Sequence, residues 1–409
     1  MGANQVRKSI NLFDLPLDST YVLLSKKVRN TIETQIAEND GIDKISKSLE
    51  IKRPYFYRFF QGRRCSLYFL SKLIGVLDMA TQEIEKNIMF ISSGKNNPKG
   101  ITNPKLPFRF DNSDGGTLLG GIMGDGSRTK LGGLTYNNCD ETLVNAVLDS
   151  AIDIFGNINQ YLVWKKDGTL QLYLPKIAGD AVGLFGIQKS YKTLSDCYVE
   201  LNGFSYEFKT SFIRQFFDDE GNVRTSDRRV QIKQTRVVFE KDAAKIRKNV
   251  ESYTPRVLLT IDLELKRIGL RPTVSLETLR SKNGIIKGDF ALSLYGKDNL
   301  TIFREKINFG IVAKKELLDK VIKNYKFPSA PRNGRIQFAL EKARVVQKRD
   351  NYITKHTLAL ECKRSLKTAT YFLVDLKKMG LVKIIEAPRN EFGKPLPWKY
   401  LLTKKSKDL

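Results

Sequence analysis

Two carboxylic acids occupy matching positions far apart in the sequence. Asp125 closes the run LLGGIMGDG and Glu220 closes IRQFFDDEG, each directly before the final glycine. If both runs are helices that pack side by side, the two acids emerge at the same end of the pair. Their repulsion favours a hard cation between them, and carboxylate oxygens suit Mg²⁺. Such a site can hydrolyse a phosphodiester. The alternative is that each acid-glycine pair only ends a helix.

The composition leaves few other routes to hydrolysis. His356 is the only histidine, which excludes catalytic triads, histidine-dependent nucleases and multi-histidine metal sites. The four cysteines form no C-x-x-C pair, so the sequence predicts neither a zinc finger nor a disulfide framework. Any hydrolysis must therefore use carboxylates, lysines and a metal.

The charge balance predicts a polyanionic partner. The 409 residues include 70 Lys and Arg against 44 Asp and Glu, and the net charge of +26 is spread along the chain. Double-stranded DNA is the expected partner, with structured RNA as an alternative. The sequence contains no apolar run of about eighteen residues and no secretory signal. We therefore expect a cytoplasmic, nucleoid-associated monomer that is not secreted and has no membrane partner.

The first acid-bearing run is predicted to be a buried helix. Its apolar residues continue nearly all round, and Gly120, Gly121 and Gly124 fall on one stripe. Each glycine costs about 1 kcal/mol of helix stability relative to alanine. We therefore expect the stripe to admit a closely packed partner helix, namely the second run.

Strand patterns follow both runs in the same order, which indicates an internal duplication. In the first copy a β-hairpin turn is marked by Lys166, Asp167 and Gly168. The predicted strands cover 132–138 and 160–174 in the first copy, and 228–239 and 256–266 in the second.

The N-terminal segment, 1–92, is predicted to be helical from residue 20 and to contain a helix-turn-helix. Ile45 and Leu49 share an apolar face, and after a short turn Pro54 begins the next helix. Phe56 and either Phe59 or Phe60 should pack inward, whereas Lys52, Arg53, Tyr55 and Arg58 should face a DNA groove. A plain helical bundle is the alternative. The next segment, 93–116, is rich in Gly, Pro, Asn and Ser and is predicted to be a basic linker.

The C-terminal segment, 331–409, is predicted to be a winged helix-turn-helix. Thr354 and Ser365 are placed as N-caps of two helices, and 382–403 has the pattern of a β-hairpin, the wing. A solvated helical pair is the alternative. The residues expected to contact DNA are Lys367, Thr368, Thr370 and Tyr371 on the second helix, and Arg389 and Lys394 on the wing.

The two acid-bearing runs resemble the name motif of the LAGLIDADG homing endonucleases. Leu118–Gly126 aligns with the first copy of the motif and Ile213–Gly221 is similar to the second. LFGIQKSYKT at 184–193 looks like the family's Leu-Gly-x-x-x-Gly-x-Lys stretch, and FREKINFGIVAKKELL at 303–318 looks like its closing segment. The resemblance covers about half of the chain. One departure is Gln215, which replaces the small residue expected at the helix crossing. The close packing of the two helices, and with it the separation of the two carboxylates, depends on how this side chain is accommodated.

The resemblance implies an α+β fold of two αββαββα repeats, at 117–211 and 212–330, whose sheets lie in the major groove. It places the metal ligands at Asp125 and Glu220. It implies an active-site lysine at Lys192 in the first repeat and at Lys314, or its neighbour Lys315, in the second. Members of the family make staggered double-strand cuts, and a single chain with two repeats would recognise an asymmetric site. Ordinary surface charge is the alternative for the lysines.

Strand alternation selects the residues that would contact DNA from the core. It puts Gln231, Lys233 and Thr235 on one face, directly after Arg228 and Arg229. In the first repeat the candidates are Arg128, Lys130, Tyr136, Asn138, Lys165 and Lys166.

Three other functions fit parts of the sequence. A non-cleaving DNA-binding regulator would use the same core and flanking modules. A maturase would hold a folded intron RNA. A nuclease of the D…E-x-K type would use Asp242, Glu264 and Lys266, provided that 256–266 is a strand.

Overall fold

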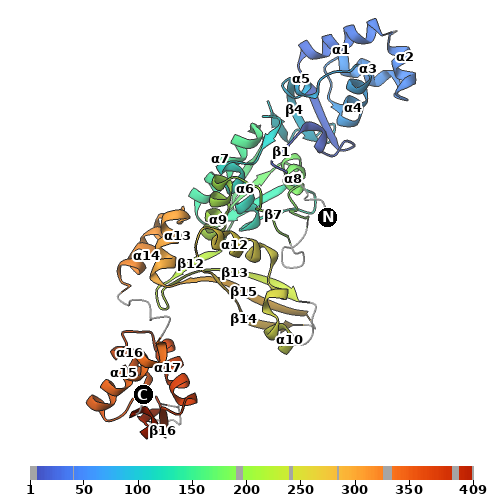
Figure 1. Ribbon diagram of the computed structural model, residues 1–409. Coiled ribbons are helices and arrows are strands. Elements are labelled where there is room, and N and C mark those ends of the chain that lie inside the picture. Colours follow the sequence, from blue (N-terminus) through green and yellow to red (C-terminus); the bar gives the residue numbers. More distant parts are fainter. Residues whose placement is uncertain are drawn as a thin grey trace. The chain divides into compact units, whose positions relative to one another are not determined.

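The computed structural model describes residues 7–39, 41–189, 197–238, 243–282, 285–325, 334–388 and 396–407 (Figure 1). The chain combines helices with antiparallel sheets and is α+β. It forms two compact units. The first runs up to Arg224 and continues over Arg229–Asp319; the second contains Thr225–Arg228 and the chain from Lys320 onward.

Helices lie at each predicted position in the N-terminal segment. Phe56 and Phe59 are buried against Phe69, and Pro54 lies in the first turn of its helix, as predicted. The segment also contains strands at Thr20–Leu24 and Ile88–Ser93, where the sequence predicts only helices. The helices are α1 (Lys26–Glu38), α2 (Gly41–Ser48), α3 (Arg53–Phe60), α4 (Leu67–Val76) and α5 (Thr81–Glu85).

The segment 93–116 is not a linker, contrary to the sequence-based prediction. Ile101, Phe108 and Phe110 are fully buried, and the short strands β5 and β6, which carry the first two, are too brief to give a periodic pattern. A five-stranded sheet takes the order β3 (Cys65–Ser66), β2 (Thr20–Leu24), β4 (Ile88–Ser93), β5 (Gly100–Thr102) and β9 (Asn157–Ile158). A second pair joins β1 (Ser9–Ile10) to β6 (Phe108–Arg109), next to the short 3-10 helix Leu12–Asp14.

The acid-bearing helix α6 (Ser113–Met123) leads into a four-stranded antiparallel sheet, called here the first sheet. Asn112 caps the helix by accepting a hydrogen bond from the Gly115 N–H at 2.8 Å. The sheet order is β10-β11-β8-β7, and its buried leucines face α7. The elements are β7 (Gly126–Arg128), β8 (Leu134–Asn138), α7 (Glu141–Phe155), β10 (Tyr161–Trp164), β11 (Leu170–Leu174) and α8 (Lys176–Gly183).

The second acid-bearing helix, α9 (Tyr206–Glu220), leads into another four-stranded sheet, called here the second sheet. Its order, β14-β15-β13-β12, places the strands in the same chain sequence as the first sheet. The elements are β12 (Gly221–Arg224), β13 (Arg229–Val238), α10 (Ala243–Lys248), α11 (Val250–Tyr253), α12 (Arg256–Arg267), β14 (Thr273–Lys282), β15 (Ile285–Tyr295), α13 (Lys297–Lys306) and α14 (Val312–Lys323).

The predicted strand at 256–266 is wrong, because this segment is helix α12. Leu258, Ile261 and Leu265 are buried at intervals of three and four residues, which is the period of a helix. Glu264 is buried between Lys209 and Arg267, and Asp262 pairs with Lys266 one helical turn away. The strand that the D…E-x-K interpretation requires is therefore absent here, and Asp242 lies outside the described residues.

The described part of the second unit contains the end of α14, then helices α15 to α17, a β-hairpin and a short 3-10 helix. Thr354 and Ser365 accept hydrogen bonds from the N–H groups of Thr357 and Thr368, as predicted for N-caps. None of the helices described in either unit is long and apolar enough to cross a membrane. The elements are α15 (Arg335–Asp350), α16 (Lys355–Glu361), α17 (Leu366–Lys378), β16 (Val382–Glu386), β17 (Lys399–Leu402) and a 3-10 helix (Lys404–Lys407).

Candidate functional site

Helices α6 and α9 pack with their backbones in direct contact. A Cβ atom built on Gly120 would lie 2.6 Å from the carbonyl oxygen of Phe212, and one on Gly116 would meet the carbonyl oxygen of Phe208. Gly121 instead faces Val147 of α7, so Gly116 takes the place predicted for it on the stripe. Gln215 is buried at the crossing without separating the helices, because Gly120 opposite it leaves room for its side chain. The two helices therefore pack closely despite the departure at Gln215.

Three of the predicted site residues converge where these helices end. Asp125 follows the C-cap of α6, Glu220 is the last residue of α9, and both are half-buried. Lys314 of α14 donates from Nζ to the carbonyl oxygens of Phe217, at 3.4 Å, and Asp218. Burial lowers the pKa of Lys314, while four nearby carboxylates oppose that shift: Asp218, Asp219, Asp125 and Glu220. Lys192 lies outside the described residues.

Asp219 is a third acid in the helix seam that sequence reasoning missed. Its carboxylate accepts from the Tyr136 hydroxyl at 2.6 Å, from the Gln215 amide at 3.0 Å and from the backbone N–H of Asp125 at 3.3 Å. It therefore links α9 to β8 and to the end of α6. Burial and the charge of Asp219 raise the pKa of Tyr136 far above its usual value, so the phenol remains a donor.

The sequence-based assignment of Tyr136 and Asn138 to a DNA-contacting face is wrong. Tyr136 points toward α6 and Asp219, and the side-chain amide of Asn138 donates to Asp125 Oδ2 at 2.8 Å. Strand alternation defines two faces without saying which is buried. The apolar neighbours Leu134 and Leu172, which share the face of Tyr136, were the available signal.

Asp218 positions Lys314 and serves a structural purpose. Its carboxylate accepts from the N–H groups of Gly310, at 2.7 Å, and Ile311, at 3.2 Å, directly before α14. Burial raises the pKa of Asp218, and these two hydrogen bonds oppose the shift. The beginning of α14 is thereby fixed against the end of α9.

The carboxylates at the helix ends suit a divalent ion that takes most of its ligands from water and from a substrate. Among the described residues no group of three or more His, Cys, Asp or Glu side chains could hold a metal ion. Asp125 and Glu220 offer one carboxylate from each helix. Mg²⁺ is commonly held by one or two carboxylates together with waters and substrate phosphates. The pair therefore fits a metal that depends on a phosphate partner.

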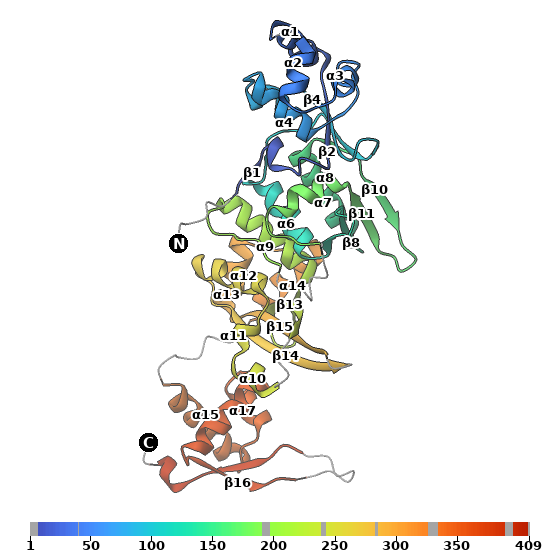
Figure 2. The same cartoon turned by 90° about the vertical axis from the view of Figure 1, so that its right-hand side faces the viewer.

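The basic residues predicted on the first sheet divide into exposed and buried ones. Lys130 is exposed, and Lys165 and Lys166 are exposed in the turn of the β10–β11 hairpin, which extends away from the helices (Figure 2). Arg128 is largely buried and donates to Asp180 at 2.9 Å and to the carbonyl oxygen of Ile187 at 3.4 Å. The structure gives Arg128 this internal ion pair in place of the predicted DNA contact.

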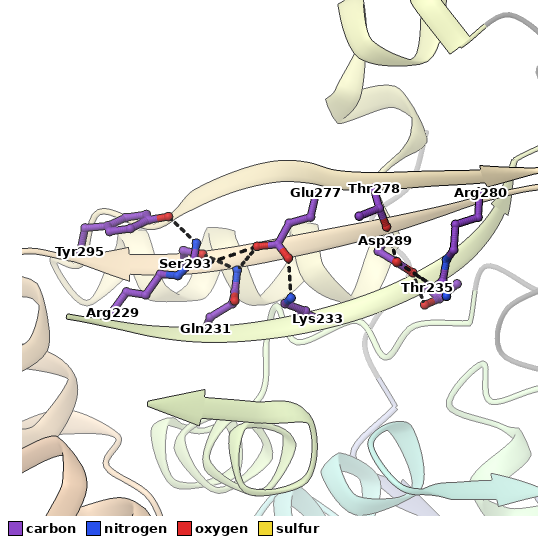
Figure 3. Close-up of polar contacts among 10 residues, drawn as sticks. All are labelled: Arg229, Gln231, Lys233, Thr235, Glu277, Thr278, Arg280, Asp289, Ser293 and Tyr295. Atoms are coloured by element: carbon purple, nitrogen blue, oxygen red, sulfur yellow. Dashed lines mark hydrogen bonds and ion pairs between the residues drawn. The ribbon is translucent and has the colours of Figure 1, made fainter. Parts of the chain in front are cut away.

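The second sheet carries its predicted residues on one face, as alternation requires. Arg229, Gln231, Lys233 and Thr235 all lie on the side of β13 opposite to the buried Val230 and Ile232 (Figure 3). Gln231 is 0% exposed, so its predicted direct contact with a base is replaced by hydrogen bonds within the sheet. Arg228, in the β12–β13 turn, lies over the ring of Tyr325, and both residues belong to the second unit.

Most of the described residues that were predicted to contact DNA from the two flanking segments are exposed on helices α3 and α17. Lys52, Arg53 and Arg58 are exposed at and along α3, and Arg53 pairs with Asp43 of α2 at 2.8 Å. Lys367 and Tyr371 are exposed on α17, whereas Thr368 is half-buried beside its cap Ser365. Arg389 and Lys394 lie outside the described residues.

Comparisons with known proteins find similarity to solved structures that include LAGLIDADG proteins. No model of a known protein family matches the chain, and no curated protein matches it. The chain is similar to the homing endonuclease I-DmoI in complex with DNA and Mn, with 16% identity, 50% of this chain and 100% of that chain covered, and a TM-score of 0.32. It is also similar to the N-terminal LAGLIDADG domain of DUF199/WhiA, with 14% identity, coverage of 52% and 90%, and a TM-score of 0.30.

Proposed function

We propose that the protein is a DNA endonuclease of the LAGLIDADG type that uses Mg²⁺ and makes a staggered double-strand cut at a specific site. The observation that carries the proposal is the convergence of Asp125, Glu220 and Lys314 at the end of a glycine-packed helix pair. One acid comes from each helix, and each helix leads into a sheet of the same strand order. This arrangement supports two half-sites that share one cleavage centre.

The protein groups have separate tasks in this mechanism. Asp125 and Glu220 would hold the metal, which supplies charge stabilisation to the attacking and leaving oxygens when bound. Asn138 orients Asp125 through its 2.8 Å hydrogen bond. Lys314 keeps a positive charge beside four carboxylates, where it lowers the repulsion that an incoming phosphate would meet. Asp219 and Tyr136 hold the helix ends in register.

The flanking modules would extend the contact with DNA. We infer that α2 and α3 form one helix-turn-helix and that α16, α17 and the β16–β17 hairpin form a winged helix-turn-helix. Their exposed basic residues, Lys52, Arg58 and Lys367, support this inference. A net charge of +26 supports binding to a long polyanion.

A non-cleaving DNA-binding regulator is the second candidate. The observation in its favour is that the acids already have partners from the protein itself. Asn138 binds Asp125, Asp219 accepts three hydrogen bonds, and the Lys314 ammonium lies among the carboxylates. Such a cluster is stabilised without a metal.

Cleavage of a duplex library separates the two candidates. Purified protein is incubated with the library in Mg²⁺ and, in parallel, in Ca²⁺, and cut ends are sequenced. We expect Mg²⁺-dependent staggered cuts that Asp125→Asn and Glu220→Gln abolish, while Asp153→Asn, an exposed acid paired with Lys105, cuts as the wild type does. Sequence-specific binding without cuts would instead establish the regulator. Tighter binding to folded RNA than to any duplex would favour a maturase.

A further inference from the structure

The outer face of the second sheet, the side that carries Gln231 and Lys233, holds two carboxylates. Glu277 continues the alternation of Thr273 and Ser275 in β14 and therefore lies on the face of Gln231 and Lys233. A β-bulge between Leu276 and Thr278 then shifts the alternation by one residue, so that Thr278 and Arg280 lie on this face as well. Asp289 of β15 stands opposite Thr235 on the same face. Figure 3 shows both acids among the basic and hydroxyl side chains of this face.

Glu277 gathers three donors around it. It accepts from the Gln231 amide at 2.6 Å, from Arg229 at 3.4 Å and from the Lys233 ammonium (Figure 3). Arg229 also donates to the Tyr295 hydroxyl at 2.6 Å, and Gln231 to Ser293 at 3.1 Å. The Lys233 side chain stays 42% exposed, so the ion pair itself is accessible from outside.

Asp289 forms a second cluster further along the strands. Arg280 donates to its two carboxylate oxygens at 2.6 and 2.7 Å, Thr235 donates at 2.7 Å, and Thr278 donates as well. Burial alone would raise the pKa of Asp289 and of Glu277, but the surrounding donors hold both values below their usual range. Both acids therefore stay ionised at neutral pH.

These pairs change what the face offers to DNA. The three cations Arg229, Lys233 and Arg280 pair with two carboxylates, so these five groups together carry one net positive charge. A phosphate that approaches a paired cation also meets the carboxylate beside it. A G·C pair in the major groove is different, because guanine presents acceptors while cytosine presents an amino donor. A cation and a carboxylate side by side match that pattern.

We propose that Glu277 and Asp289 are specificity-determining residues, each of which recognises a G·C pair together with its cation and weakens binding to unrelated duplex. The proposal rests on the proposed DNA-binding function. Lys233 and Thr235, which mark the two clusters on β13, are two residues apart. This separation is about 7 Å along a strand and corresponds to about two base pairs.

The test selects duplexes from a random library in EDTA with the wild type, Glu277→Gln and Asp289→Asn. Asp153→Asn is the matched control, because it also removes one paired carboxylate but lies on α7. We expect wild-type sites with two G·C preferences about two base pairs apart in one half-site, one lost in each variant. For a random duplex, each variant should steepen the slope of log binding constant against log salt concentration by about 0.9. Its affinity should therefore fall about threefold more than that of the wild type between about 50 and 200 mM salt.

The outcomes distinguish this inference from the proposed function. Unchanged selected sites and unchanged salt slopes in both variants would overturn the inference while leaving DNA binding intact. The same slope change in Asp153→Asn would overturn it too, because net charge alone would then explain the effect. If the wild type bound no duplex, the proposed function itself would fail. The two clusters do not share a carboxylate, so either variant tests the proposal if the other fails to fold.

Discussion

The two four-stranded sheets share a strand order but differ in the polar groups on each face. The outer face of the second sheet carries two ion-pair clusters, whereas that of the first carries uncharged pairs: Ser127 with Thr135 at 2.9 Å and Tyr173 with Gln171 at 2.5 Å. On the inner face it is the first sheet that carries the polar groups. Tyr136 and Asn138 of the first sheet reach the acids of the helix pair, but Val230 and Ile232 of the second are buried apolar residues.

This difference shows that two sheets with the same strand order can carry different functional side chains. The shared strand order places a sheet beside each acid-bearing helix. The side chains then assign the sheets different tasks: the first sheet fixes the geometry of the acids, and the second arranges charge on its outer face. The comparison predicts that equivalent substitutions in the two sheets have unequal effects.

The largest expected effect comes from Tyr136→Phe. Loss of the hydroxyl removes a donor from Asp219 in a buried seam, so we expect a loss of about 1–3 kcal/mol in the free energy of unfolding. The matched change in the second sheet is Tyr295→Phe, whose hydroxyl binds Arg229 but whose side chain is 40% exposed. Its cost should be much smaller. Urea unfolding measures both, and equal losses would remove the proposed difference between the sheets.

Lys314→Met should raise the metal affinity of the site, on the order of tenfold at neutral pH, because it removes a positive charge near Asp125 and Glu220. Burial lowers the pKa of Lys314, so as the pH rises the wild type should lose this proton, and gain metal affinity, below the usual lysine value near 10.4. The variant should lack that rise. Lys166→Met is the control, and an identical pH dependence in all three proteins would contradict the assignment.

The smallest effects are expected in the β10–β11 hairpin. Lys165→Ala and Lys166→Ala should each make the salt dependence of DNA binding shallower by about 0.9 in log–log slope, because the exposed lysines would contact phosphates. Specific and random duplexes should be affected alike. A selective loss at one base position would instead assign these lysines to base recognition.

Local patterns in the sequence were sufficient for the helix pair and for much of the strand content. The acid-glycine ends, Gly120 and Gly124 on the stripe and the hairpin turn at Gly168 each depend on a few neighbouring residues, and they lie where such patterns place them. The helices and N-caps of the second unit were predictable for the same reason.

Features that depend on distant residues could not be predicted in the same way. The alternation in Ile261–Lys266 fits a strand as well as α12, because the run is too short to separate the two periods. Thr278 and Arg280 share a face with Glu277 only because of a bulge, which shifts the alternation by one residue. Asp219 stands between two other acids in the sequence, Asp218 and Glu220. Only the fold shows that Asp219 is the one that binds Tyr136.

The most direct test of the central claim is whether Asp125 and Glu220 share one metal. Binding of Mn²⁺, a substitute for Mg²⁺ at oxygen sites, can be followed by the loss of the free-ion EPR signal in the presence of duplex DNA. We expect the wild type to bind the ion and Asp125→Asn, Glu220→Gln and the double variant to lose it to the same extent, because two ligands of one ion are not additive. Wild-type affinity in either single variant, or losses that add in the double variant, would contradict a shared site.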